Sequence, residues 1–287
     1  MEFWFITTDH LTDRIWFRDD DDFKMGMNLV AVLAVALKVD VLSFILMSNH
    51  VHFVLCCSKG KADQFIQEYK KRYSQYVNQK YGTKELLRRV SVDIQSINGM
   101  DESVEWVIAY TQMNPVAAGI CLTPEGYPWG TGNVFFRIKA SKGRRIDTFS
   151  ERARVALLHS TQPLPSNYLV GEEGYILPES YVLVNLVETT FRTPQRMNYF
   201  LRNSSKAKRR LDSEKAEAPS FQDQLIHSAI PTLCQALFRK LSFAALTREE
   251  QAELLKQLRY RFSANVNQLA RVTGIPYDQV TILLDSV

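Results

Sequence analysis

The stretch Ser48-Asn49-His50-Val51-His52-Phe53-Val54-Leu55 alternates polar and apolar side chains and directly follows an apolar run over residues 39–47. Alternation with a period of two is typical of a β-strand, in which successive side chains point to opposite faces. The two segments therefore predict a β-hairpin with Ser48-Asn49 at its turn. In the second strand, His50 and His52 share one face and the apolar residues share the other.

The two histidines form a candidate half-site for a metal ion. A rise of about 3.3 Å per residue places their Cβ atoms roughly 6–7 Å apart, so both imidazoles can reach one ion. His10, His159 and His227 lie elsewhere in the sequence, so the pair does not result from a His-rich composition. The alternative is a polar strand face that only meets solvent, and the pair alone does not decide between the two.

The segments around this hairpin predict an α+β fold. Residues 2–8 and 89–97 resemble strands, and residues 23–38, 63–81 and 101–113 resemble helices. Asp19 to Asp22 precede the first helix, where carboxylates cap free N–H groups and complement the helix dipole. A metal site is the alternative for these four aspartates. The order of elements predicts an antiparallel sheet with helices on one face, completed within residues 1–136.

Composition places the chain among ordinary globular proteins. It has 287 residues, of which 46% are apolar and 23% charged. Its four cysteines show no zinc-binding spacing, which favours a reduced, cytoplasmic protein. The longest apolar run, residues 29–37, is too short to span a bilayer, and the first residues lack the basic region of a signal peptide. We therefore expect a cytoplasmic protein without a membrane partner.

Positive charge is concentrated in one segment. Residues 59–89 hold nine cationic and three acidic residues, whereas the whole chain has a net charge of only +4. Lys70, Lys71 and Arg72 lie off the predicted packing face of the 63–81 helix, so we expect them to contact phosphate groups of a nucleic acid. A solvated helix face is the alternative.

The remainder divides by composition. Residues 137–202 form a mixed extension, and residues 203–219 are a polar, charged linker. Its cations, candidate DNA contacts, are Lys206, Lys208, Arg209 and Arg210. Residues 220–287 predict a helical domain, in which 266–273, a turn at 274–276 and 277–284 fit a helix-turn-helix. A simple helical hairpin fits this last pattern nearly as well.

Tyr110 and Asn114 are four residues apart on the predicted helix and so lie on one face. A phenol has a pKa of about 10 and is a weak nucleophile at neutral pH. Against a phosphodiester polarised by a metal ion it needs little basicity, and the tyrosine ester would keep the energy of the broken bond for rejoining. Asn114 would offer a carbonyl oxygen as a third metal ligand. Alternatively, Asn114 caps the helix before Pro115 and Tyr110 only packs.

Two motifs together identify a resemblance to a known family. Met47-Ser48-Asn49-His50-Val51-His52, followed by Tyr110 and then Asn114-Pro115-Val116-Ala117-Ala118-Gly119, resembles the IS200/IS605-type single-tyrosine (Y1) transposases of the HUH superfamily. The branch associated with repetitive extragenic palindromes is the most similar one. The resemblance covers residues 1 to about 136.

This resemblance implies a ferredoxin-like catalytic domain that acts on single-stranded DNA with hairpin or palindromic elements. It assigns the metal, Mg²⁺ or Mn²⁺, to His50, His52 and Asn114, and the nucleophile to Tyr110, which would form a 5′-phosphotyrosine. Gln112 is a second polar residue near the tyrosine, although two residues along a helix it faces away. A nucleoid-associated bacterial protein that forms a homodimer would be in keeping with this family.

We therefore expect a metal-dependent transposase, or a domesticated relative, that cleaves and rejoins single-stranded, hairpin-flanked DNA. The alternative is a non-catalytic DNA-binding regulator that retains the fold and uses the helix-turn-helix. A phosphodiesterase that activates water would also use the histidines, but it would tolerate the loss of Tyr110.

Overall fold

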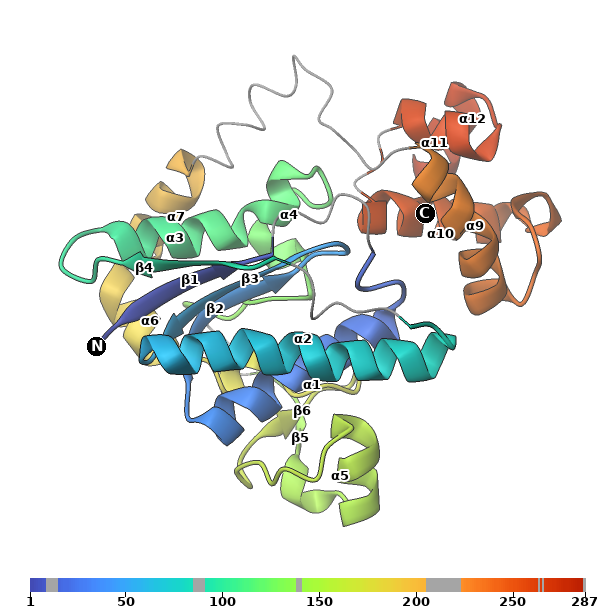
Figure 1. The fold of residues 1–287 in the computed structure, drawn as a ribbon. Helices are drawn as coiled ribbons and strands as arrows, with labels where there is room; N and C mark the ends of the chain where they lie inside the picture. The colour runs from blue at the N-terminus through green and yellow to red at the C-terminus, as the bar shows by residue number, and fades with distance from the viewer. Residues whose placement is uncertain are drawn as a thin grey trace.

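The computed structural model describes residues 1–8, 15–84, 91–137, 141–204, 223–262, 264 and 266–285. The N-terminal part follows the order β1 (Phe3–Thr7), α1 (Asp20–Leu37), β2 (Asp40–Leu46), β3 (Val51–Cys56), α2 (Lys59–Tyr81) and β4 (Asp93–Ile97). The four strands form one antiparallel sheet in the order β2-β3-β1-β4 (Figure 1). This is the predicted ferredoxin-like α+β arrangement, and the fold class is confirmed.

The predicted hairpin forms with a two-residue turn. Met47 N–H donates to the carbonyl oxygen of His50 at 2.8 Å, which closes the turn at Ser48-Asn49. Strand β1 then inserts between β3 and β4, with Thr7 opposite both His52 and Asp93. Residues directly opposite in a ladder share a face, so Thr7 and His52 lie on the same side of the sheet.

Alternation along the strands builds two cores, one on each face of the sheet. Ile6, Phe44 and Phe53 pack under α1 and α2. The opposite face carries Phe5 and Val54, covered by α3 (Ser103–Gln112) and α7 (Pro194–Asn203) (Figure 1). The sequence predicted helices on one face, and the structure adds this second helical layer.

A partly buried ionic cluster joins the beginning of α1 to the end of α2. Asp19 caps α1 by accepting from Asp22 N–H at 2.9 Å, as the aspartate run predicted. Lys80 Nζ donates to Asp19 at 2.6 and 2.7 Å and to Asp22 at 2.8 Å. Burial and the neighbouring Asp19 charge raise the pKa of Asp22. These aspartates therefore fix two helices to each other.

The segment between α3 and the C-terminal helices shares the same two cores. It contains α4 (Asn114–Ala117), β5 (Arg144–Arg145), α5 (Glu151–Leu158), β6 (Leu169–Val170), α6 (Val184–Phe191) and α7, with 3-10 turns at Pro124–Gly126, Ile146–Thr148 and Pro178–Ser180. Asn28 of α1 donates to Leu157 O at 3.0 Å and accepts from Ile176 N–H at 2.8 Å. The predicted boundary at residue 136 does not separate two cores.

The C-terminal helices form a third core of their own. They are α9 (Asp223–Phe238), α10 (Arg248–Phe262), α11 (Val266–Thr273) and α12 (Tyr277–Asp285), with a 3-10 turn at Phe243–Ala245. Their buried residues include Leu254, Leu258, Leu269, Val280 and Leu283. The predicted helical C-terminal region is thus confirmed. Within the described part of the chain, no helix combines the length and apolar character needed to cross a membrane.

Candidate active site

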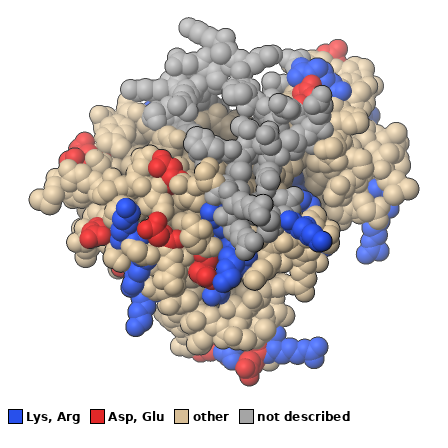
Figure 2. Space-filling model, viewed as in Figure 1, with Lys and Arg blue, Asp and Glu red and all other residues tan. Residues whose placement is uncertain are grey.

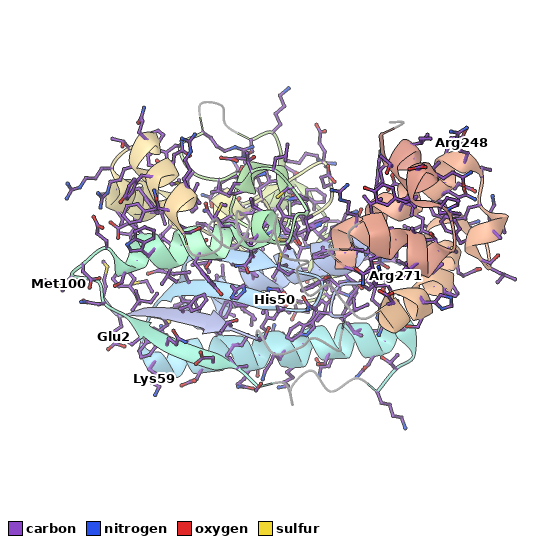
Figure 3. All side chains as sticks on the ribbon, turned by 90° about the horizontal axis from the view of Figure 1, so that it is seen from above. Glu2, His50, Lys59, Met100, Arg248 and Arg271 are labelled. Atoms are coloured by element: carbon purple, nitrogen blue, oxygen red, sulfur yellow. The ribbon has the colours of Figure 1, made fainter. Side chains whose placement is uncertain are left out.

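The hairpin turn brings the two histidines together on the face covered by α3. His50 directly precedes β3 and His52 is its second residue, and their ring centroids are 4.9 Å apart. His50 Nδ1 lies 2.7 Å from Asn49 Oδ1. With Nδ1 as the donor in this contact, the lone pair of His50 is on Nε2, the atom that would ligate a metal ion. Figure 3 shows His50 at the end of the sheet nearer the C-terminal helices, with Glu2 and Met100 at the other end.

Helix α3 places Tyr110 against the second histidine. The Tyr110 and His52 ring centroids are 5.9 Å apart, and the rings are nearly perpendicular at 88°. The Tyr110 side chain is only half-buried, so part of it remains accessible. The structure therefore brings His50 and His52, at the start of β3, together with Tyr110 of α3. A shared site made from the two sequence motifs requires this proximity.

Phe5 is a site residue that the sequence motifs did not reveal. Its ring stacks on His52 with centroids 5.5 Å apart and 6° between the planes, and it meets Tyr110 edge-on at 5.8 Å. Aromatic contacts of this kind add about 0.5–1.5 kcal/mol beyond area burial and fix ring orientation. The signal that could have revealed Phe5 is its position in β1, two residues before Thr7 and so on the face that Thr7 shares with His52.

Asn114 lies at the junction of α3 and α4, where it caps the tyrosine helix. Its Nδ2 donates to Tyr110 O at 3.0 Å and to Thr111 O at 3.1 Å. These two bonds satisfy carbonyl groups that a helix end leaves without intrahelical partners. The side chain is buried, and its Oδ1 is the atom that would bind a cation. Capping and a metal-ligating role would therefore use different atoms of this side chain.

Gln112 takes a different direction from the histidine site. It is buried, and its Nε2 donates to Thr131 O at 3.4 Å. This agrees with the helical spacing, which places Gln112 on the far side of α3 from Tyr110.

The three residues that the sequence motifs assign to a metal would offer a divalent cation mixed ligands. Among the described residues, no group of three His, Cys, Asp or Glu side chains is arranged to hold a metal ion. The candidate set therefore consists of two imidazole nitrogens and one amide oxygen. Such ligands accommodate Mn²⁺ readily and Mg²⁺ less so, because Mg²⁺ prefers oxygen.

The predicted basic contact surface on α2 requires one correction. The Lys70 side chain is buried with 2% exposure, and loss of water lowers its pKa, so it does not track phosphates on the surface. It lies in a second buried row of α2 with Ala62, Ile66 and Ser74, beside the aromatic row. Because three of these four residues are polar or small, hydrophobic periodicity did not show that the buried face was this wide.

Lys71 and Arg72 remain more exposed, and both pair with Glu68, at 3.3 and 3.4 Å. Exposed pairs of this kind contribute little to stability and can exchange partners. Figure 2 shows acidic and basic side chains interspersed over the described part of the viewed face. The other predicted cations, Lys206, Lys208, Arg209 and Arg210, lie outside the described residues.

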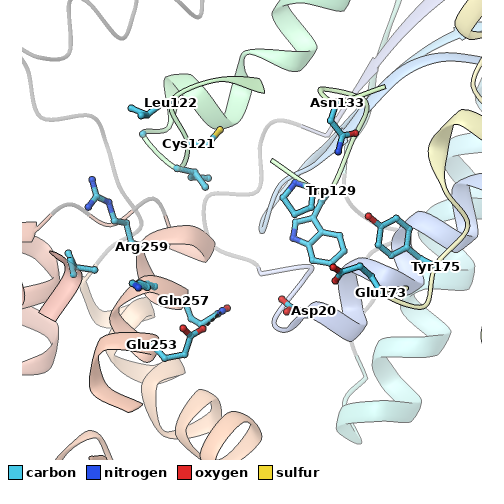
Figure 4. Close-up of a pocket in the computed structure, with 15 residues that line it drawn as sticks. Asp20, Cys121, Leu122, Trp129, Asn133, Glu173, Tyr175, Glu253, Gln257 and Arg259 are labelled. Atoms are coloured by element: carbon cyan, nitrogen blue, oxygen red, sulfur yellow. Dashed lines mark hydrogen bonds between the residues drawn. The ribbon is translucent and has the colours of Figure 1, made fainter. Parts of the chain in front are cut away.

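A cavity of about 790 Å³ lies where the C-terminal helices meet the N-terminal part. Figure 4 shows Glu253, Gln257 and Arg259 of α10 across from Trp129 and Tyr175. Its lining contains three carboxylates, from Asp20, Glu173 and Glu253, but only two cations, Lys256 and Arg259. This excess of negative charge does not favour a phosphate-binding channel.

Comparison with known proteins matches part of the chain. Residues 14–91 match the family model of IS200-like transposases, a segment that contains both histidines but ends before Tyr110. A solved structure of a REP-associated tyrosine transposase bound to a REP hairpin is 15% identical, with a TM-score of 0.36, and the match covers 46% of this chain and 77% of that one. No curated protein matches the sequence. Over residues 14–91, the family model confirms the resemblance to the IS200-like transposases that the histidine motif predicted.

Proposed function

We propose that this protein is a DNA transposase, or a domesticated relative, that cleaves and rejoins single-stranded DNA through Tyr110. The observation that carries the proposal is the meeting of Tyr110 with His50 and His52 on one face of the sheet. The likeness of residues 14–91 to IS200-like transposases supports the same reaction class. A water-using phosphodiesterase would not need a tyrosine at this position.

The reaction is a transesterification at phosphorus. Tyr110 Oη forms a bond to the scissile phosphorus, and the bond from phosphorus to the 3′ oxygen breaks. The phenol loses its proton and the departing 3′ oxygen gains one, which leaves a 5′-phosphotyrosine and a free 3′-OH. Attack by a 3′-OH on this ester reverses the step and rejoins the strand, since the bond energy is retained.

His50, through Nε2, His52 and the Oδ1 atom of Asn114 would hold Mg²⁺ or Mn²⁺. When bound, the ion supplies positive charge that stabilises the phosphoryl oxygens as charge develops on them. The protein's own part is orientation. Asn49 holds the His50 ring, Phe5 stacks on His52, and the two bonds from Asn114 fix the end of the tyrosine helix.

The substrate we propose is single-stranded DNA flanked by hairpin or palindromic elements. Lys71 and Arg72 could contact its phosphates if they release Glu68, and such contacts would make binding weaken as salt rises. A homodimer and association with the nucleoid remain predictions from the family resemblance.

The covalent intermediate gives a direct test. Labelled single-stranded oligonucleotides from the flanks of the gene, including any palindromes, are incubated with the protein and Mn²⁺ and resolved on a denaturing gel. We expect a protein–DNA band that disappears in Tyr110→Phe and His50→Ala and on removal of the metal by a chelator. Tyr199→Phe, at an exposed tyrosine of α7, is the matched control and should retain the band. A band that persists in Tyr110→Phe would refute the assignment.

A non-catalytic regulator is the second candidate, and the geometry of α11 and α12 favours it. The two helices are joined by Gly274-Ile275-Pro276, where Gly274 has a φ of 74°, and Tyr277 is half-exposed at the start of α12. This fits a helix-turn-helix, although α12 contains no Lys or Arg. Metal-independent binding to duplex DNA, without any covalent band, would favour this reading.

A further inference from the structure

The far side of the tyrosine helix borders a cavity of about 620 Å³ that the proposed reaction does not use. It lies between the end of α3, residues 132–137 and α7, and its size is within the roughly 300–1,000 Å³ of small-ligand pockets. Its lining residues are Gln112, Glu125, Gly132, Asn133, Phe135, Phe136, Arg137, Pro194, Met197, Asn198 and Leu201. Gln112, which lines the cavity from α3, is two positions after Tyr110.

Gln112 gives this cavity an acceptor that lacks a donor. The side chain is 1% exposed, and its Nε2 donates a hydrogen bond to Thr131 O. Its Oε1 is buried and has no hydrogen-bond partner among the described residues. A buried acceptor without a donor is costly, so a donor from a bound ligand or an ordered water would stabilise this site.

The remaining polar groups are amides, and the walls are apolar. The side-chain amides of Asn133 and Asn198 line the cavity, and each amide has both a donor and an acceptor. Phe135, Met197 and Leu201 supply its apolar surface. One cation, Arg137, is offset by one carboxylate, Glu125, and Arg137 also pairs with Glu179 at 3.2 Å. A neutral, planar ligand with donors and acceptors on its edge therefore fits better than a free phosphate.

The backbone is held in an unusual conformation at this cavity. Phe136 has a φ of 54°, which is rare for a bulky residue, and its N–H donates to Glu188 Oε1 at 2.6 Å. A Cβ at Gly132 would lie 2.1 Å from Pro124 O, so only glycine allows this close approach of the two loops. Strained backbone of this kind concentrates at ligand sites.

We propose that this cavity binds one unpaired nucleobase of the DNA strand, and that Gln112 Oε1 accepts from the exocyclic amino group of that base. Cytosine and adenine carry such a group on their hydrogen-bonding edge, whereas thymine carries a carbonyl at the equivalent position. The inference rests on the proposed function, because the ligand class follows from the position of the cavity beside the tyrosine helix.

Two homopolymers that differ mainly in this group provide the test. Binding of fluorescent single-stranded dC and dT 12-mers to the full chain is measured by anisotropy without added metal. We expect the wild type to bind dC about tenfold more tightly than dT, as one well-placed base contact would give. Gln112→Met should abolish this preference because it removes the acceptor while retaining the volume of the side chain.

Two exposed amides on α7 provide a matched pair that does not disturb the core. Asn198 lines the cavity and Gln195 does not, so Asn198→Ala should weaken dC binding severalfold and Gln195→Ala should not. Equal affinity of the wild type for dC and dT, a preference retained in Gln112→Met, or no binding to either 12-mer would overturn the proposal.

The covalent band of the preceding experiment separates the two proposals. A band from the wild type together with equal dC and dT affinities would refute the nucleobase pocket alone. The absence of any band, with dC preference present and dependent on Gln112, would refute the tyrosine reaction but support the pocket.

Discussion

Phe5 contacts two of the three candidate site side chains, His52 and Tyr110, through one ring. It stacks on His52 and meets the edge of Tyr110, so its own position limits the movement of both. The residue belongs to β1, far in sequence from the tyrosine helix. Its role could not be deduced from motif spacing, because it depends on β1 pairing with β3 and on α3 packing over both.

We expect Phe5→Leu to slow formation of the covalent band about tenfold with little loss of stability. Replacement of one large apolar residue by another usually costs less than about 1.5 kcal/mol, whereas the stacking that orients His52 is lost. Rates are measured by quenched time courses, and stability by thermal unfolding. Phe44→Leu, on the other face of the sheet, is the control with the same change in volume. Equal rates in the two variants would remove any role of Phe5 in the site.

At the scale of elements, α1 and α2 cross closely because α1 carries a glycine at the contact. A Cβ at Gly26 would lie 2.6 Å from Phe17 Cε1 and 2.9 Å from both Leu46 Cδ1 and Tyr69 Oη. Glycine has a lower helix propensity than alanine, but at this position it allows α1 to pack more closely against the sheet and α2.

We expect Gly26→Ala to lower the free energy of unfolding by about 1–3 kcal/mol, the usual cost of overpacking a core. Gly60→Ala, in α2, adds a Cβ that meets nothing within 4 Å, and we expect it to stabilise by up to about 1 kcal/mol through helix propensity. Chemical denaturation of both variants measures the difference. A neutral or stabilising Gly26→Ala would show that the helices can move apart without loss.

The elements themselves were largely predictable, because the hairpin alternates with a period of two and the helices carry caps. The Asp19 cap and the Gly82 stop, with a φ of 63°, lie where the sequence placed them. Helix α2 begins at Lys59, four residues before the predicted start, since no apolar row marks its first turn. The burial of Lys70 could not be predicted, because its row on α2 also holds Ser74 and therefore resembles an exposed helix face.

At the scale of the whole molecule, two cores share the sheet and a third stands apart. The Asn28 bonds to Leu157 and Ile176 span more than a hundred residues, and no local pattern predicts such contacts. They explain why the segment after α3 packs against the N-terminal helices. The C-terminal core meets the rest through few described contacts, among them Ile15 and the Arg261–Asp20 pair at 3.4 Å.

We therefore expect two calorimetric transitions on heating. Separate cores with a small junction unfold as separate cooperative units. Leu258→Ala should lower the midpoint of one transition, by removing about 2–5 kcal/mol from the C-terminal core, and leave the other unchanged. A single transition that shifts as a whole would show that the junction couples the cores strongly.

The packing of α3 on the sheet of its own chain has a consequence for inheritance. Because Tyr110 and both histidines come from one polypeptide, a single copy contains every side chain of the candidate site. Two defective alleles, one without the tyrosine and one without the histidines, would then not complement each other in the same cell. A chain that lacks the tyrosine would gain nothing from a second chain that lacks the histidines, since neither chain holds all three side chains.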